Sequence, residues 1–226
     1  MIGKYLAALA ALASLAAATP AMAQYYYSGR TYQALRWQID AGFSPTVGTT
    51  ADYLNDGWTV GGGLTWYPSE RVPLGLRVDA SYSEFGANSN LVALGERVTQ
   101  TDIDYGVGRV WGGDVDAEYD LQLGRGVKGY LLAGIGGYQR EVELYQTVVA
   151  GGFFCDPWWG YCGGYYPIGA PVSKTTTAGE FAWNAGLGLE FPLPGGLSWF
   201  VDVRYVQIGP PDERTEFVPI RVGLRF

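Results

Sequence analysis

The last ten residues of the chain, Phe217 to Phe226, constrain the fold more than any other stretch. They read FVPIRVGLRF, so apolar side chains at every second position alternate with Arg221, Gly223 and Arg225. Successive side chains of a β-strand point to opposite faces of the sheet. A strand with one face in lipid and the other in a polar barrel lumen has this pattern. The end of the chain therefore predicts a transmembrane strand that finishes on an aromatic residue, Phe226.

The first 23 residues have the three parts of a secretory signal peptide. Lys4 is the only charged residue before position 30, Leu6 to Ala18 is apolar, and Ala21-Met22-Ala23 forms a small-x-small site. We predict cleavage between Ala23 and Gln24, which leaves residues 24–226 as one domain. The alternative is a membrane-anchor helix, but the run is shorter than the roughly 20 apolar residues that a spanning helix needs.

Seven earlier segments alternate in the same way, which predicts an all-β fold, an eight-stranded antiparallel up-and-down transmembrane β-barrel. The fifth segment is ambiguous because consecutive apolar residues blur its alternation, and there we expect Tyr130, Leu132, Tyr138, Val142 and Leu144 to face outward. The fourth is longer than a bilayer requires, so strands four and five either project beyond the membrane or form a tall barrel. The expected strands are residues 35–44, 58–66, 74–82, 102–121, 129–144, 180–191, 197–205 and 217–226.

Connection length and aromatic placement both favour a membrane barrel. Long connections (45–57, 83–101, 145–179) alternate with short ones (68–73, 124–126, 192–196), as extracellular loops and periplasmic turns do. Aromatic residues gather near the expected strand ends, where membrane barrels have two girdles. A soluble lipocalin-like barrel is the alternative, but it would have to place Trp and Leu inside on nearly every strand.

These features together resemble the small outer-membrane barrels of the OmpA-like, OmpX-like and opacity-protein type. The resemblance covers the whole chain after the signal peptide and rests on the architecture and on Phe226, which resembles the terminal signal read by the barrel assembly machinery. It implies localisation in the outer membrane of a Gram-negative type of cell, with outer-membrane lipid and that machinery as partners.

The charged residues on the opposite face of the strands are expected to fill the lumen. Buried charges are costly unless they are paired, so we predict a network of ion pairs between arginines and acids. Catalysis by carboxylates alone is the less favoured alternative. The expected lumen residues are Arg36, Asp40, Arg77, Asp79, Asp114, Asp116, Glu118, Asp120, Glu190, Asp202, Arg204, Arg221 and Arg225.

The composition limits the activities that this chain can have. It contains no histidine, which excludes the histidine-dependent mechanisms of the known outer-membrane lipases, deacylases and proteases. We therefore expect no enzyme activity, no catalytic residues, no metal site and no cofactor. The net charge of −7 argues against nucleic acid as a partner.

The longest connection contains the only two cysteines, Cys155 and Cys162. In an exported chain such a pair is expected to form a disulfide, with free thiols or metal binding as alternatives. Aromatic residues suited to binding hot spots surround the pair. They either bind a ligand or pack on neighbouring loops or lipid. The candidates are Phe153, Phe154, Trp158, Trp159, Tyr161, Tyr165 and Tyr166.

The function expected from the sequence is a structural or surface-interaction role, resembling that of an adhesin, through long extracellular loops that contact an extracellular protein or another surface ligand. The alternative is a narrow pore for ions or small solutes, because an eight-stranded barrel has room for little more than its own side chains.

Overall fold

The computed structural model of the chain describes residues 34–226, except 70–71, 125, 156–161 and 211–212. The predicted signal peptide lies outside the described residues and stays a prediction. The strands are β1 (Leu35–Ser44), β2 (Leu54–Trp66), β3 (Leu74–Ala87), β4 (Tyr105–Gly124), β5 (Val127–Cys155), β6 (Cys162–Pro192), β7 (Ser198–Ile208), β8 (Thr215–Phe217) and β9 (Ile220–Arg225). The helices are η2 (Gly48–Asp52), α2 (Ser89–Thr99) and η3 (Pro194–Gly196).

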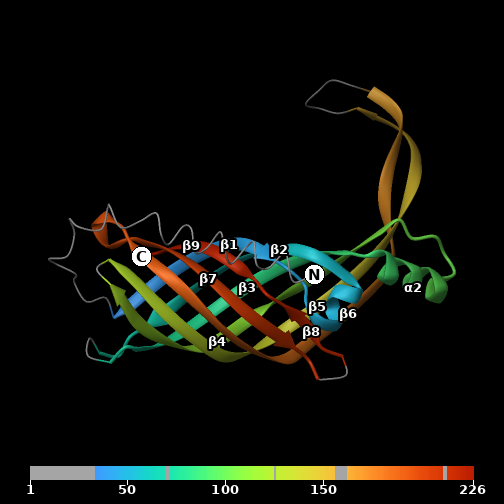
Figure 1. The fold of residues 1–226 in the computed structure, drawn as a ribbon. Coiled ribbons are helices and arrows are strands. Elements are labelled where there is room, and N and C mark those ends of the chain that lie inside the picture. The colour runs from blue at the N-terminus through green and yellow to red at the C-terminus, as the bar shows by residue number, and fades with distance from the viewer. Residues whose placement is uncertain (1–33, 70–71, 125, 156–161, 211–212) are drawn as a thin grey trace.

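The sheet closes on itself to form a barrel (Figure 1). Strands β1 to β7 each pair antiparallel with the next, and β9 pairs with both β7 and β1. Strands β8 and β9 are two parts of one spanning segment, interrupted at Val218-Pro219. The predicted eight-stranded antiparallel barrel is therefore confirmed.

The barrel is apolar outside and charged inside. On β1, for example, Trp37 and Ile39 are 54% and 56% exposed, whereas Arg36 and Asp40 are 9% and 7% exposed. Exposed aromatic rings lie near both ends of the strands, among them Trp58 and Trp111 at one end and Trp66, Tyr119 and Phe226 at the other. Such a surface fits the hydrocarbon core and the two interfaces of a membrane. In the following, the end that carries Leu35 and Phe226 is called the terminus end and the opposite end the loop end.

The prediction for the fifth strand is wrong. Tyr130, Leu132, Tyr138 and Leu144 are buried on the inner face of β5 and its extension, and Val142 is half-buried, while Leu131 and Ile135 point outward. Alternation of polarity cannot show which side chains of β5 face the lumen, because the lumen beside β5 contains apolar groups as well as charges.

A helix occupies much of the stretch 83–101 that was expected to be a loop. Helix α2 begins where the Asn88 side chain accepts hydrogen bonds from the Asn90 and Leu91 amides, at 2.9 and 3.2 Å, and it ends at Gln100 in the left-handed conformation. No helix in the described part of the chain is long and apolar enough to cross a bilayer.

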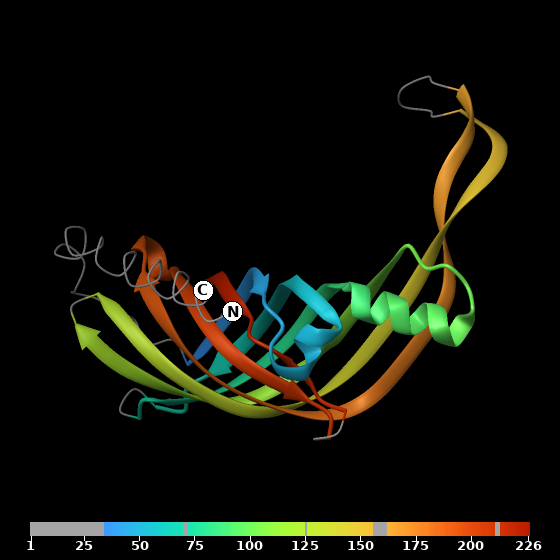
Figure 2. The ribbon, with the colours of Figure 1, turned by 45° about the vertical axis from the view of Figure 1, so that its right-hand side comes forward.

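The segment that projects from the loop end is formed by β5 and β6, and not by strands four and five (Figures 1 and 2). The stretch 145–179, expected to be a loop, is largely a two-stranded continuation of these strands. The fourth strand also begins later than expected, at Tyr105, because Ile103 is buried at α2 and not on the outer face.

Candidate functional site in the lumen and at the loop end

The lumen contains a network of buried ion pairs. Its arginines and acids come from six strands, and nearly every one of the charged residues expected in the lumen is buried; the exception is Asp120, which is half-buried and lies 3.6 Å from Lys128 Nζ. The buried members are Arg36, Asp40, Arg77, Asp79, Asp114, Asp116, Glu118, Glu190, Asp202, Arg204, Arg221 and Arg225. The structure thus brings these residues together inside the barrel.

Arg77 lies at the centre of the network and is completely buried. Its Nε lies 2.8 Å from Asp79 Oδ2, its Nη1 lies 3.2 Å from Glu118 Oε2, and its Nη2 lies 3.6 Å from Asp202 Oδ2. Arg204 contacts two of these acids as well, with Nη2 2.6 Å from Asp79 Oδ2 and 3.5 Å from Asp202 Oδ2. Asp79 and Asp202 are therefore each shared by at least two arginines, which fixes the planar guanidinium groups and links distant strands.

Arg225 of β9 connects the last strand with three other strands at the terminus end of the barrel. It donates to Glu118 at 3.0 Å, to Glu190 at 2.9 Å and to Gln38 at 3.0 Å. Its guanidinium also lies over the Tyr130 ring, 5.0 Å from the centroid. Arg36 pairs with the other side of Glu190 at 2.5 Å. The final strand is thereby held to β1, β4 and β6 by charge-assisted bonds as well as by its backbone ladder.

The buried acids of this network outnumber its buried arginines. Asp114 has no arginine partner among the described residues; the Tyr138 hydroxyl donates to its Oδ2 at 2.5 Å, and its Oδ1 has no partner there. Within the same part of the chain, Asp40 forms an ion pair with Arg221 alone, at 3.4 Å. The described residues contain no group of three or more His, Cys, Asp or Glu side chains arranged to hold a metal ion.

An apolar cluster fills the lumen on the loop-end side of the network. Its members come from almost every strand, and Leu91 of α2 packs against it from outside. The Phe85 and Phe217 rings meet edge to face, 5.4 Å apart. The cluster, here called the apolar plug, consists of Leu54, Phe85, Val110, Tyr138, Ala182, Val206, Ile208 and Phe217. The alternation pattern did not reveal it, because several of these residues occupy positions on the inner face where a polar residue was expected.

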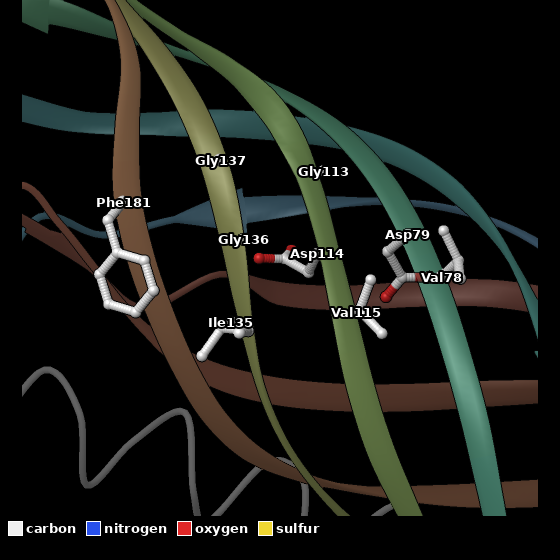
Figure 3. Close-up of a pocket in the computed structure, with 9 residues that line it drawn as sticks. All are labelled: Val78, Asp79, Gly113, Asp114, Val115, Ile135, Gly136, Gly137 and Phe181. Atoms are coloured by element: carbon white, nitrogen blue, oxygen red, sulfur yellow. The ribbon is translucent and has the colours of Figure 1, made fainter.

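The outer surface has a shallow hollow across β3 to β6 (Figure 3). It forms because Gly113 and Gly137, which are paired in register, carry no side chains between the larger Val115, Ile135 and Phe181. It is open and lies on the apolar outer face, so it has none of the features of an enclosed catalytic cavity.

A cluster of charged side chains lies at the base of the projecting hairpin. Arg109 contacts Glu84 at 3.2 Å, Glu141 at 3.1 Å and Glu143 at 2.5 Å, and Lys174 lies 2.8 Å from Glu143. Hydrogen bonds from Lys174, Tyr145 and Arg109 lower the pKa of Glu143 to about 2. These residues lie beyond the aromatic rings of the loop end, and no pattern in the sequence singled them out.

The predicted binding residues lie on or next to the distal part of the hairpin. Phe153 and Phe154 belong to β5, and Tyr165 and Tyr166 belong to β6, while Trp158, Trp159 and Tyr161 fall outside the described residues. Cys155 and Cys162 are direct partners in the β5–β6 ladder. Direct antiparallel partners have Cα atoms about 4.5–5.5 Å apart, a separation that a disulfide can bridge.

The closed sheet, its apolar outer face and its charged lumen define an integral outer-membrane β-barrel. The chain belongs to the family described as the outer membrane protein beta-barrel domain, whose model matches residues 7–226. The recognition of a small outer-membrane barrel from the sequence is confirmed, and the outer membrane is its location.

The chain is similar to solved structures of bacterial outer-membrane proteins. Neisserial surface protein A is 13% identical, with 87% of this chain and 98% of that chain covered and a TM-score of 0.52. A major outer membrane protein of Thermus thermophilus is 12% identical, with 86% and 99% covered and a TM-score of 0.50. Ail of Yersinia pestis, in complex with the heparin analogue sucrose octasulfate, is 13% identical, with 86% and 100% covered and a TM-score of 0.44. No curated protein matches the chain.

Proposed function

We propose that this barrel is a closed membrane anchor that displays a surface-interaction structure, formed by the β5–β6 hairpin and α2, on the extracellular side of the outer membrane. The observation that carries the proposal is the combination of a filled lumen with a long projecting hairpin. The hairpin extends well beyond the end of the barrel, and its distal part stands clear of the other elements in both views (Figures 1 and 2).

The filled lumen argues against the pore alternative. An ion that entered from the loop end would have to pass the apolar plug, and apolar constrictions exclude water and ions. Beyond the plug, the lumen contains the network of buried arginines and acids, of which Arg77, Glu118 and Arg225 are completely buried. We therefore expect no stable open conductance in planar bilayers. Large and long-lived conductance steps from purified protein would refute the closed anchor.

We further propose that the protein is not an enzyme. The chain has no histidine, and the buried carboxylates of the lumen are held by arginines and tyrosines. The disulfide between Cys155 and Cys162 and the recognition of Phe226 by the barrel assembly machinery remain part of the proposal as well.

A truncated hairpin tests the surface role. Gln146 and Ala170 are direct partners, so replacing residues 147–169 by an Asn-Gly turn should retain the barrel. Cells that display the full and the truncated protein are compared for attachment to wells coated with collagen, with heparin or with serum albumin. We expect the truncation to reduce attachment to at least one coat by about tenfold, equivalent to roughly 1.4 kcal/mol. Equal attachment of both forms to every coat would refute the proposal.

The aromatic tip has its own variant. Replacing Trp158 and Trp159 by Ala leaves the described part of the hairpin intact. Attachment that falls as far as with the truncation would assign the binding to the tip, and unchanged attachment would assign it to the strands. The gel mobility shift on heating, which distinguishes folded from unfolded barrels, serves as the control for folding in each case.

A further inference from the structure

The distal part of the β5–β6 hairpin has two free strand edges. Strand β4 pairs with β5 only as far as Tyr145, and β7 pairs with β6 only as far as Ala182. Beyond these points, the described parts of β5 and β6 pair only with each other. A free edge presents unpaired N–H and C=O groups that can form a ladder with another strand.

Prolines block the edge of β6. The Tyr145 carbonyl accepts from the Asp104 amide, so the backbone groups of Tyr145 point away from β6. Their partner Pro171 therefore has its nitrogen on the free side of β6, and Pro167, opposite Val149, has the same orientation. Because proline has no N–H, the free edge of β6 lacks donors at both positions.

The edge of β5 remains open. Its first free donor, Thr147 N–H, is capped by Asp104 Oδ2 at 2.6 Å. By the alternation of the ladder, Val149 and Gly151 point their backbone groups to the same free side. Residues 146–155 read QTVVAGGFFC and carry no charge. Beyond the Asp104 carboxylate at Thr147, the edge therefore has no charge that would repel a second copy, unlike the charged edges that usually prevent such pairing.

We propose that two copies of this protein pair through the β5 edges of their projecting hairpins, forming a four-stranded antiparallel sheet in the order β6-β5-β5-β6. A two-fold arrangement uses the same edge on both copies and closes the assembly. The proline-blocked β6 edges then lie on the outside and prevent growth into a fibre. The distal hairpin turns away from the barrel axis in both views, so two barrels in one membrane can bring these edges side by side (Figures 1 and 2).

Variants of Val149 test the backbone edge separately from its side chain. Val149→Pro removes one open donor and places a ring on the edge, whereas Val149→Ala removes most of the side chain but retains the N–H. Sedimentation velocity of the folded barrel in detergent micelles, over a wide range of protein concentration, measures dimerisation. We expect wild type and Val149→Ala to dimerise, and Val149→Pro to dimerise at least about tenfold more weakly, since it loses hydrogen bonds at the pairing edge.

Several outcomes would overturn the proposal. A wild-type protein that remains monomeric at all concentrations has no such pairing, even where it binds an unrelated extended peptide. Equal weakening by Val149→Ala and Val149→Pro would assign the contact to side chains. Each variant must first show the gel shift on heating that indicates a folded barrel.

The prolines provide an independent test. Replacing both Pro167 and Pro171 by Thr restores two donors on the β6 edge. We expect this variant to form assemblies larger than a dimer, because both edges of the hairpin are then open. A variant that stays dimeric would show that the prolines do not limit the assembly. The truncation of residues 147–169 should yield monomers, whatever its effect on surface attachment, so this inference and the proposed surface role can fail separately.

Discussion

Removing Arg77 should destabilise the barrel more than removing any exposed charge. Arg77 is completely buried and contacts Asp79, Glu118 and Asp202. Its replacement by Met roughly preserves length and volume but leaves three buried acids with one cation fewer. Removing one residue of a buried ion pair costs about 3–5 kcal/mol, since the remaining charge is desolvated without its partner. We expect Arg77→Met to lie near the lower value, because Arg204, Arg221 and Arg225 still contact the same acids.

The assay is reversible urea unfolding of the refolded barrel in lipid vesicles, followed by tryptophan fluorescence. Arg97→Met is the matched control, since Arg97 is exposed on the last turn of α2. Surface substitutions usually change stability by no more than about 0.5 kcal/mol, so this variant should unfold almost as wild type does. Adding Glu118→Gln to Arg77→Met removes one of the buried charges that has lost a partner, and it should recover part of the lost free energy of unfolding.

Two results would contradict this reasoning. If Arg77→Met and Arg97→Met change the free energy of unfolding equally, the network contributes little beyond packing. If Glu118→Gln worsens Arg77→Met, Glu118 is not stranded by the loss of Arg77 and is fully compensated by Arg225 and Tyr67.

Three further predictions concern the loop end of the barrel. Phe85→Ala leaves a cavity in the apolar plug and should cost about 3–5 kcal/mol in the same unfolding assay, whereas a loss below about 1 kcal/mol would show that the plug is loosely packed. Asn88→Ala removes the N-cap of α2 and should reduce amide-exchange protection in the helix by about 1 kcal/mol, while protection in β1 to β4 stays unchanged. Equal protection of the helix in Asn88→Ala and wild type would show that the cap contributes nothing. The pKa of Glu143 is depressed to about 2 from the ordinary 4.5, so its stabilising effect is complete above pH 4.5 and is lost as the pH falls toward 2. Amide exchange at the hairpin base should therefore rise over this pH range in wild type but much less in Glu143→Gln. Parallel pH profiles of the two proteins would contradict this role of Glu143.

The sequence predicted the barrel because its outer face is uniform. Membrane lipid requires an apolar side chain at nearly every outward position, so alternation around residues such as Arg36 and Asp40 indicates both strand and facing. The charged residues that face the lumen could be predicted from the same alternation. The partners of these charged residues could not be predicted, because no local pattern encodes a contact between residues more than a hundred positions apart. Arg225, for example, contacts Glu118 only when the barrel is closed.

The pattern failed where the lumen itself is apolar. Tyr138 and Leu132 face inward but read as lipid-facing residues, because polarity was the only criterion for facing. Helix α2 was also missed, although Asn88 followed by Leu91, Gly95 and Val98 has the cap and the spacing of a short helix. The stretch 145–179 was expected to be a loop, whereas Pro167 and Pro171 lie in β6, whose free edge accepts proline.

The failure in the hairpin has a physical origin of its own, and it bears on how the protein is built. The membrane-spanning part must satisfy lipid outside and pack charges inside, so its residues are constrained by two environments at once. The distal hairpin pairs only with itself among the described residues, and none of the lumen arginines depends on it. Its sequence is therefore free of the barrel's alternation, which makes it hard to predict and allows it to change without loss of the fold. An element with that freedom, standing on a strongly paired barrel, is where a surface function can be built.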